Sequence, residues 1–341
     1  MIEDIRKKRV ALVGGAGFIG HNLALKLKSR GADVTIIDGL NVNNLLYLNQ
    51  SDVDLANKEI YKEFIEERLQ LIRENDITLY VEDARDYHKL SQTLSKAKPD
   101  VVILLAAVAH ANRSNKDPYS TFDHSFRTLE NALDWSRSRA EHFIYFSSSM
   151  VYGNFDEEFV TEESPCNPIG IYGALKYGGE KLVQAYQQVF DLPYTIIRPS
   201  ALYGERCISK RVGQAFIENA MVGKNLKIMG DGSDRLDFTY IDDLVSGVIN
   251  VIENTESRNE IFNLTYGSSS SLNDLAQIIQ ENFEGIEINY KERDRLMPER
   301  GTLSVEKARK LIGYNPQHPV EKGYVSYINW YKKRYSKHFN G

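Results

Sequence analysis

One stretch decides the fold of this chain: Arg9-Val10-Ala11-Leu12-Val13-Gly14-Gly15-Ala16-Gly17-Phe18-Ile19-Gly20. Its first part is mostly apolar and predicts a buried strand, and the run from His21 to Ser29 predicts a helix. Glycines between a strand and a helix let the backbone approach a pyrophosphate, while the helix N-terminus supplies N–H groups and the positive end of its dipole. We therefore expect a dinucleotide-binding turn, whose cofactor-binding residues are Gly14, Gly17, Phe18, Ile19 and Gly20.

A second predicted strand, Asp33 to Ile37, ends at an acidic residue, Asp38. An acid about 20 residues beyond the glycines binds the adenosine ribose hydroxyls in such sites. A carboxylate there repels a 2′-phosphate, and no arginine follows it directly, so NAD is favoured over NADP as the cofactor. The alternative is a tight structural turn with no nucleotide. The order of strand, glycines, helix, strand and acid disfavours that alternative.

Strand and helix patterns alternate through the first two-thirds of the chain. Further strands are expected at 77–81, 101–106, 143–146 and 194–197, and helices at about 87–96, 120–138 and 172–190. This alternation predicts an α/β fold with a doubly wound parallel sheet, which binds its ligand at the carboxyl ends of the strands. The alternation of predicted strands and helices is less regular after residue 199. We expect an NAD-binding domain at 1–199 and a smaller mixed α/β substrate-binding lobe at 200–341, with possible exchange of chain between the two.

The segment 39–82 is longer than a strand–helix–strand connection needs. Its part from Leu55 to Glu74 has charged helical character, which predicts a surface helix. A flap over the adenosine or a partner-binding element is the alternative.

The stretch Tyr172-Gly-Ala-Leu-Lys176 places a phenol and an ammonium one turn apart on one helix face. An ammonium favours the phenolate, so we expect Lys176 to lower the pKa of Tyr172 from its usual value of about 10. Such a base can take a proton from an alcohol near neutral pH, as alcohol oxidation requires. A hydroxyl from the upstream run Ser147-Ser148-Ser149 would hold the substrate oxygen. Chance helix-face spacing is the usual interpretation of such a pair alone, but here the glycine turn accompanies it.

The composition and net charge of the chain limit the kinds of partner that we expect. The chain has 341 residues, 26% of them charged, and a net charge of -5, which gives no sign of a nucleic-acid-binding surface. No stretch is apolar over the length that a membrane span needs, and the N-terminus shows no apolar signal region, so we expect a cytoplasmic protein. Its two cysteines, Cys166 and Cys207, indicate neither a disulfide framework nor a metal site. The basic run at 6–9 is interpreted as a solvated strand entry, with a phosphate or localisation patch as the alternative.

Several motifs together resemble those of the extended short-chain dehydrogenases/reductases that act on nucleotide sugars, a family with a Rossmann fold. UDP-galactose 4-epimerase and the dTDP-glucose 4,6-dehydratases are members. The resemblance covers nearly the whole chain and rests on Gly14 to Gly20, Asp83-Ala84-Arg85-Asp86, Leu105-Ala106-Ala107, Ser147 to Gly153, Tyr172 to Lys176 with Gly179-Glu180, Arg198-Pro199-Ser200 with Tyr203-Gly204, Asp237-Phe238 with Ile241-Asp242-Asp243, and Arg300-Gly301.

The resemblance implies roles for residues that spacing alone does not assign. It implies that Asp83 and Ala84 contact the adenine and that Lys176 holds the nicotinamide ribose. It implies further cofactor contacts at Leu105, Ala106, Ala107, Ser147, Pro199 and Ser200. It makes Ser148, with Ser149 as its neighbour, the catalytic hydroxyl beside Tyr172. It also implies that Arg300 binds a substrate phosphate.

Departures from the family pattern narrow the chemistry. The dehydratases carry an acid and a base where this chain has Ser149 and Met150, and a thioether cannot transfer protons, so dehydration is disfavoured. Many members carry an arginine where this chain has Leu236, with Arg235 displaced by one position. We therefore expect a modified site for the substrate diphosphate, with Arg235, Arg300 and Arg113 as candidates.

These expectations combine in an NAD-dependent enzyme that acts on a nucleoside-diphosphate sugar, with 4-epimerisation favoured by its frequency in the family. A C4 dehydrogenase or ketoreductase and a 2-epimerase use the same residues and stay open. A non-catalytic NAD-binding sensor is disfavoured because Tyr172 and Lys176 are both present. Many members are homodimers that pair through helices corresponding to about 120–138 and 172–190, so a homodimer is expected. Apolar residues on these helices fit that interface or packing on the sheet: Leu129, Ala132, Leu133, Leu182 and Val183.

Overall fold

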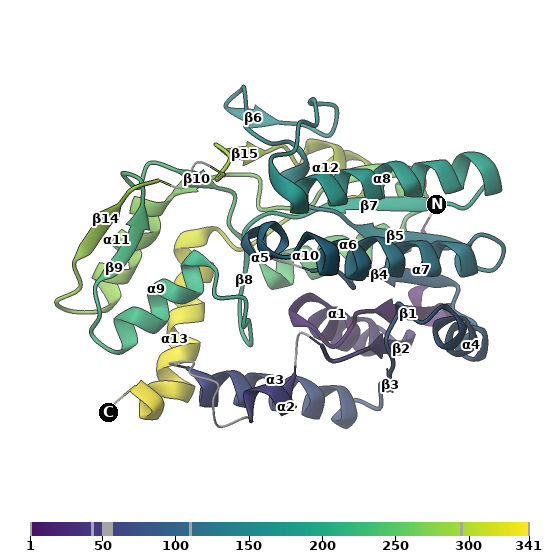
Figure 1. The fold of residues 1–341 in the computed structure, drawn as a ribbon, viewed down its shortest axis with the longest axis horizontal. Helices are drawn as coiled ribbons and strands as arrows, with labels where there is room; N and C mark the ends of the chain where they lie inside the picture. The colour runs from purple at the N-terminus through teal and green to yellow at the C-terminus, as the bar shows by residue number, and fades with distance from the viewer. Residues whose placement is uncertain (1, 42–43, 50–56, 109–110, 294–295, 340–341) are drawn as a thin grey trace.

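The structure is a computed structural model and describes residues 2–41, 44–49, 57–108, 111–293 and 296–339. Its centre is a parallel sheet of seven strands, in the order β12-β7-β5-β4-β1-β2-β3. The strands are β1 (Arg9–Val13), β2 (Asp33–Asp38), β3 (Thr78–Val81), β4 (Val101–Leu104), β5 (His142–Phe146), β7 (Tyr194–Arg198) and β12 (Glu260–Asn263). The predicted doubly wound parallel sheet is confirmed (Figure 1).

Helices cover both faces of this sheet because its strands are apolar on both sides. Val10 and Leu12 of β1 belong to a core shared with α1 (Phe18–Ser29), α10 (Ile241–Glu253) and α12 (Glu306–Ile312). Ala11 and Val13 point to the opposite core, with α4 (Tyr87–Ala97), α7 (Thr128–Ser136) and α8 (Gly170–Phe190). Successive side chains of a strand point to opposite faces, so a strand covered on both faces becomes continuously apolar.

The C-terminal part of the chain contributes to both regions of the molecule. Strand β12 pairs in parallel with β7, and α10 packs against α1, so these elements belong to the sheet. The smaller region contains α9 (Val212–Met221), α11 (Leu272–Asn282) and α13 (Val320–Phe339), with the pair β9 (Leu226–Met229) and β14 (Ile288–Lys291). Ser271 and Asp274 form a capping box at the start of α11.

Short elements connect these parts. Three two-stranded pairs are β6 (Phe159–Val160) with β15 (Thr302–Leu303), β8 (Leu202–Tyr203) with β11 (Thr239–Tyr240), and β10 (Arg235–Leu236) with β13 (Ser270–Ser271). The remaining helices are α2 (Leu45–Leu48), α3 (Lys58–Glu74), α5 (Ala111–Lys116) and α6 (Pro118–Phe122). The single turns are η1 (Ile5–Lys7), η2 (Asp123–Arg127), η3 (Ser149–Val151) and η4 (Thr255–Ser257). Among the described helices, none combines the length and the apolar character that crossing a lipid bilayer would require.

The helix expected at 120–138 is interrupted. Helix α6 leads into η2, a π-helical turn, before α7 begins. The Thr128 hydroxyl donates to the His124 carbonyl at 2.7 Å and lies 3.3 Å from the Ala106 carbonyl. The wider turn therefore brings a polar side chain to the end of β4, and such turns are frequent at functional sites.

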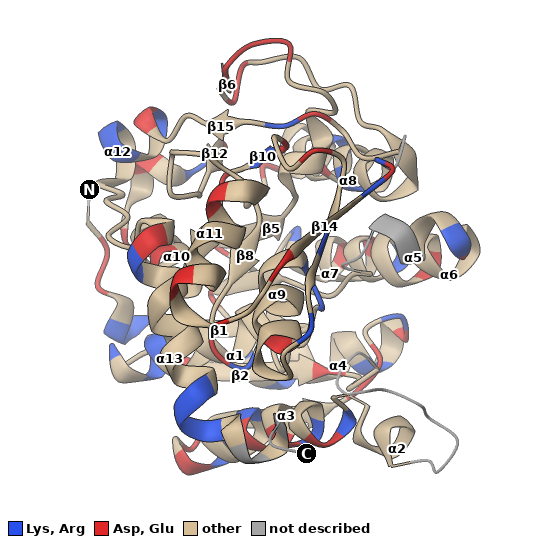
Figure 2. Cartoon of the chain, turned by 90° about the vertical axis from the view of Figure 1, so that its left-hand side faces the viewer, with Lys and Arg blue, Asp and Glu red and all other residues tan. Residues whose placement is uncertain are grey.

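The charged segment before β3 is packed rather than freely exposed. Its predicted first residue, Leu55, lies outside the described residues, and α3 begins at Lys58. Phe64 is fully buried, with its ring centroid 5.2 Å from that of Trp330 and 5.0 Å from that of Tyr335, both on α13. Figure 2 marks acidic residues along α3 and basic residues along α13, and Glu67 pairs with Arg334 at 2.5 Å. Because α3 also packs on α1, it joins the N-terminal region to the C-terminal helix.

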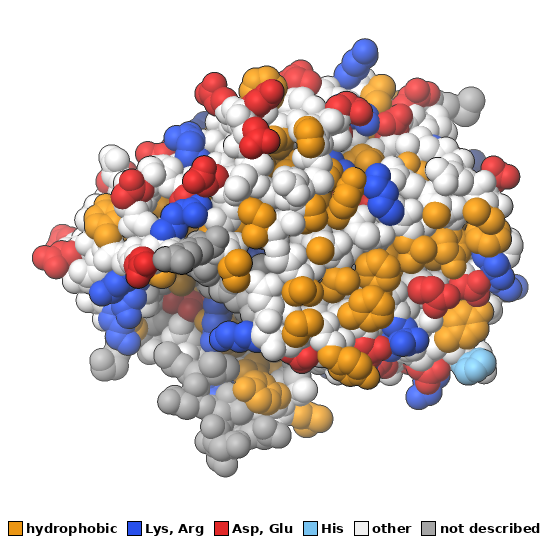
Figure 3. Space-filling view, turned by 45° about the horizontal axis from the view of Figure 1, so that its top comes forward, with side chains coloured by type: hydrophobic (Ala, Val, Ile, Leu, Met, Phe, Trp, Pro, Cys, Tyr) orange, Lys and Arg blue, Asp and Glu red, His pale blue; other side chains and the backbone are white. Residues whose placement is uncertain are grey.

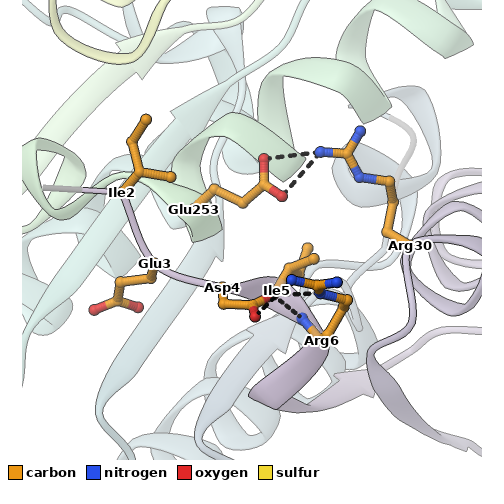
Figure 4. Close-up of a pocket in the computed structure, with 7 residues that line it drawn as sticks. All are labelled: Ile2, Glu3, Asp4, Ile5, Arg6, Arg30 and Glu253. Carbon is orange, nitrogen blue, oxygen red and sulfur yellow. Dashed lines mark hydrogen bonds and ion pairs between the residues drawn. The ribbon is translucent and has the colours of Figure 1, made fainter.

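The basic run before β1 is neutralised by carboxylates. Its ion pairs are Arg6 with Asp4 at 2.9 Å, Lys8 with Glu141 at 2.7 Å and Arg9 with Asp100 at 2.5 Å. In the shallow pocket nearby, Arg30, which follows α1, pairs with Glu253 of α10 at 2.9 Å (Figure 4). These pairs fit a strand entry and not a phosphate patch.

Candidate functional site

The predicted site residues gather at one edge of the sheet. Parallel strands that lie side by side end at a common edge, where ligands of doubly wound sheets bind. Each of six strands there ends on or is followed by a predicted residue: Gly14 after β1, Asp38 on β2, Asp83 after β3, Leu105 after β4, Ser147 after β5 and Pro199 after β7.

The glycine turn combines two close backbone contacts with one open position. Gly14 has φ +83°, and a Cβ there would lie 2.4 Å from the Ala106 nitrogen. A Cβ on Gly20 would lie 2.4 Å from the Gly15 carbonyl oxygen, so α1 packs closely on the turn. A Cβ on Gly17 would meet only the Gly14 carbonyl oxygen, at 3.8 Å. Contacts within the protein therefore require glycine at 14 and 20. The space beside Gly17 is open, so a ligand group such as a pyrophosphate could approach the backbone there.

The N-terminus of α1 faces this open position. No side chain among the described residues caps the helix at Gly17, and its first turn carries no acid. The first N–H groups of a helix need acceptors, which an anion can supply. Phe18 and Ile19, the first two helical residues, pack against the core and anchor the turn.

Asp38 lies directly against the glycine turn. Its carboxylate accepts hydrogen bonds from the backbone N–H groups of Ala16, at 2.9 Å, and Leu40, at 2.8 Å. Burial nevertheless raises the pKa of Asp38, because a charged carboxylate loses its water. Asp38 therefore stabilises the glycine turn, and it also lies at the position where an acid that binds the ribose is expected.

The adenine side of the predicted site is also ordered by polar contacts. Asp83 pairs with the Arg85 guanidinium at 2.6 Å, which lowers the pKa of Asp83, and Arg85 also reaches Asp123 at 2.8 Å. Ala84 is buried, and its carbonyl accepts from the Asn131 amide at 2.9 Å. Asn131 was not predicted as a site residue, because no local motif marks its position on α7. The remaining predicted lining residues, Leu105, Ala106 and Ala107, are half-buried between β4 and the glycine turn.

Tyr172, Ser148 and Lys176 come together as expected. Tyr172 and Lys176 lie on α8, and Ser148 precedes η3, where its hydroxyl forms a hydrogen bond with the Tyr172 phenol. The Lys176 ammonium donates to the Phe146 carbonyl at 2.6 Å and lies 5.2 Å from the centre of the Tyr145 ring. The phenol, the hydroxyl and the ammonium thus surround the end of β5.

The expected effect of Lys176 on the phenol is wrong for the protein without ligand. Burial raises the pKa of Tyr172, and the groups that oppose this rise are Arg211 and Ser148. Lys176 instead binds the Phe146 carbonyl, and burial lowers its own pKa to about 8. Sequence spacing showed that the two residues share a helix face, but not where the ammonium points or how much water is lost.

The loops after β5 and β7 are joined beside these residues. The Ser149 N–H donates to the Pro199 carbonyl at 3.0 Å, and Ser200 is buried next to it. The Ser147 hydroxyl donates to the Glu180 carboxylate at 2.5 Å. The loop that carries Ser148 is therefore held from both sides.

The predicted substrate arginines differ in their surroundings. The Arg300 Nε is buried and has no hydrogen-bond partner in the part of the chain that the structure describes. Burial and the charge of Arg211 lower the pKa of Arg300 to about 10. The Arg235 Nε donates to the Ser269 hydroxyl at 3.0 Å. Arg113 is on α5, and its side chain lies outside the described residues.

Arg211 was not singled out in the sequence. It stands just before α9, and its charge acts on both Tyr172 and Arg300. The available signal was weak, because Arg211 is one of several cations in the loop at 206–211. Only the fold shows which of them approaches the phenol.

Comparisons with known proteins identify the family of this chain. A model of the "NAD dependent epimerase/dehydratase family" matches residues 10–265. A protein of Methanocaldococcus jannaschii named "Putative UDP-glucose 4-epimerase" is 30% identical over 332 residues, or 95% of this chain and 98% of that protein. The structure of UDP-glucuronic acid 4-epimerase from Bacillus cereus, in complex with UDP-glucuronic acid and NAD, matches with TM-score 0.85 and 25% identity, covering 96% of this chain and 99% of that one. UDP-glucose 4-epimerase from Thermotoga maritima shares the fold, with TM-score 0.82 and 24% identity over 95% of this chain and 98% of that one. The chain belongs to the NAD-dependent epimerase/dehydratase family.

Proposed function

We propose that this protein is an NAD-dependent 4-epimerase of a nucleoside-diphosphate sugar. The observation that carries the proposal is the phenol of Tyr172, hydrogen-bonded to Ser148, at the same sheet edge as an open glycine turn. The 4-epimerases among the relatives and structural neighbours support the same reaction.

The cofactor residues fit NAD. The open position at Gly17 and the uncapped N-terminus of α1 would receive the pyrophosphate, and Asp38 would receive the adenosine ribose. Lys176 would hold the nicotinamide ribose. When bound, NAD would supply a reversible acceptor for the hydride of the sugar carbon.

The protein's own residues would move the proton. Ser148 would hold the sugar hydroxyl by a hydrogen bond, and Tyr172 would take its proton and later give it back. Because burial raises the pKa of Tyr172, the free protein holds the phenol protonated at neutral pH. The charge of Arg211 opposes this rise and so favours the phenolate that the forward step requires. Ser149 would support Ser148, whereas Met150 leaves no acid–base pair for dehydration.

The substrate diphosphate would be bound mainly by residues from 200–341, and the cofactor mainly by residues from 1–199. Arg300 is the strongest candidate, because its buried Nε has no partner among the described residues and its cation lies near that of Arg211. Two neighbouring cations repel each other, and a diphosphate relieves that repulsion. Arg235 and Arg113 are further candidates.

A reaction assay separates the alternatives. The purified protein with NAD would be incubated with UDP-glucose, UDP-glucuronic acid or UDP-N-acetylglucosamine, and the products analysed by NMR. We expect inversion at C4 without net NADH. Net NADH would instead indicate a C4 dehydrogenase, inversion at C2 would indicate a 2-epimerase, and NAD binding without any turnover would indicate a sensor.

A homodimer is proposed from the apolar face of α6 and α8. Tyr119 is 86% exposed and Val189 is 69% exposed, and the Phe122 ring stacks on that of Phe126 at 5.3 Å. Figure 3 shows apolar side chains gathered over this side of the molecule. In contrast, Leu129, Ala132, Leu133 and Val183 are buried against the sheet, and Leu182 packs on the same core. Sedimentation at a monomeric mass would contradict the dimer.

The unpaired cysteines support a cytoplasmic location.

A further inference from the structure

A buried carboxylate lies directly behind the reacting residues. Glu180 is 1% exposed and follows Lys176 by one turn of α8. It accepts hydrogen bonds from the Arg198 guanidinium, at 2.7 and 2.9 Å, and from the Ser147 hydroxyl, at 2.5 Å. The arginine and the glutamate are both almost fully buried, at 3% and 1% side-chain exposure.

Three segments of the site meet at this carboxylate. Ser147 immediately precedes Ser148, and Arg198 immediately precedes the loop of Pro199 that is joined to Ser149. The third segment is α8 itself, which carries the reacting phenol and ammonium. A change at Glu180 therefore reaches the loops after β5 and β7 as well as the helix that carries Tyr172 and Lys176.

Stability alone does not account for such a pair. A buried ion pair is often no more stabilising than apolar side chains of the same volume, because desolvation of the charges offsets their attraction. Here Arg198 pairs with the Glu180 carboxylate, and a second buried cation, Lys176, lies one turn earlier on the same helix. The negative charge of Glu180 opposes the fall in the pKa of Lys176 that burial causes.

We propose that Glu180 is a positioning residue, which fixes the loops of Ser147 and Arg198 behind the reacting residues and presents its charge to Lys176 one turn away on α8. The proposal rests on the proposed function, in which Lys176 acts as a cation at the nicotinamide ribose.

The groups that face Lys176 agree with this role. The Phe146 carbonyl and the Tyr145 ring contact it from β5, and Tyr172 lies one turn away on its own helix. Arg198 faces it from β7 through the shared glutamate. Burial lowers the pKa of Lys176 to about 8, and the charge of Glu180 opposes that fall.

A second glutamate provides a matched control. Glu162 is also buried, at 8% exposure, and its carboxylate accepts from the Asn263 N–H at 2.7 Å. Its carbonyl accepts from Arg198 at 3.3 Å, so it belongs to the same network. It is not among the groups that shift the pKa of Lys176.

The test measures the ionisation of Lys176 directly. The protein without NAD would be labelled with ¹³C at the lysine ε-carbon and titrated by NMR, with Lys176→Arg assigning the signal. We expect a midpoint near 8 in the wild type. In Glu180→Gln we expect it to fall by about one pH unit. Glu162→Gln should lower thermal stability but leave the midpoint in place.

Other outcomes decide the proposal as well. Glu180→Asp retains the charge and should give an intermediate midpoint, and it replaces Glu180→Gln if that variant does not fold. Equal midpoints in the wild type and the Glu180 variants would overturn the proposal, even if the enzyme epimerises sugars. Conversely, a shifted midpoint in a protein without activity on any sugar nucleotide would overturn only the proposed function.

Discussion

One methyl group added at Gly17 or at Gly20 should have opposite consequences for folding and cofactor binding. In Gly17→Ala the new Cβ meets no atom closer than 3.8 Å, and the backbone φ of -75° suits alanine. Losing glycine at the N-cap costs about 0.5–1 kcal/mol. The stiffer unfolded chain contributes about 0.4–1 kcal/mol in the other direction. These effects nearly cancel, so we expect the free energy of unfolding to change by less than about 0.5 kcal/mol.

NAD binding should respond differently in this variant. The methyl group occupies the space where the pyrophosphate would approach the backbone. We expect the Kd for NAD to rise at least about tenfold, which corresponds to about 1.4 kcal/mol.

Gly20→Ala places the same methyl group 2.4 Å from the Gly15 carbonyl oxygen, so backbone must move. Overpacking at the upper end of the usual range costs about 3 kcal/mol. The higher helix propensity of alanine returns about 1 kcal/mol. We therefore expect a net loss of about 2 kcal/mol in the free energy of unfolding.

Urea denaturation of the NAD-free proteins and calorimetric titration with NAD would measure both quantities for wild type, Gly17→Ala and Gly20→Ala. Wild-type NAD affinity in Gly17→Ala would refute the assignment of this open position to the pyrophosphate. Wild-type stability in Gly20→Ala would refute the close packing of α1 on the turn.

Three further predictions concern other parts of the molecule. Phe64→Ala should destabilise the protein by about 3–5 kcal/mol in urea denaturation, because it empties a fully buried site between α3 and α13. The same change at Leu46, which is 82% exposed, should have little effect; similar losses in both variants would contradict the packing of α3. Lys176→Met should be more stable than wild type at pH 7, and the difference should shrink by about 3 kcal/mol between pH 8 and 10.5. Between these pH values Lys176 binds fewer protons in the native state, where its pKa is lowered to about 8, than in the unfolded state. The free energy of unfolding of wild type therefore rises with pH, and its difference from that of Lys176→Met shrinks. A difference that stays constant with pH would contradict the lowered pKa of Lys176. Tyr172→Phe should keep the fold and lose epimerisation. The difference between the tyrosinate absorbance of wild type and that of this variant isolates Tyr172, and it should show a phenol that titrates above pH 10. A lower midpoint would contradict the effect of burial on the pKa of Tyr172.

Much of the fold follows from local patterns. The strand, the glycine turn and the helix at residues 9–29 form as expected, because alternating burial and turn chemistry act over a few neighbouring residues. The helix that carries Tyr172 and Lys176 forms for the same reason. The capping box that starts α11 is likewise a local arrangement.

Other features depend on residues far apart in the chain. The sequence of β12 does not indicate which sheet this strand joins. Its parallel pairing with β7, a strand far away in the chain, places it in the central sheet. The charged face of α3 suggested exposure, whereas Phe64 on its other face packs into the aromatic cluster of α13. The hydrogen bond from Thr128, just after the π-helical turn η2, to the Ala106 carbonyl also joins residues far apart in the chain.

The sequence by itself determined the doubly wound sheet, the glycine turn and the spacing of Tyr172 and Lys176, because each is set by the order of neighbouring residues. Only the tertiary structure decided that burial raises the pKa of Tyr172, that Arg211 opposes this rise, and that Glu180 lies behind Lys176 with Arg198. The physical reason is that a pKa depends on the water a group loses and on the charges that surround it. Both are fixed by elements that meet only when the chain folds.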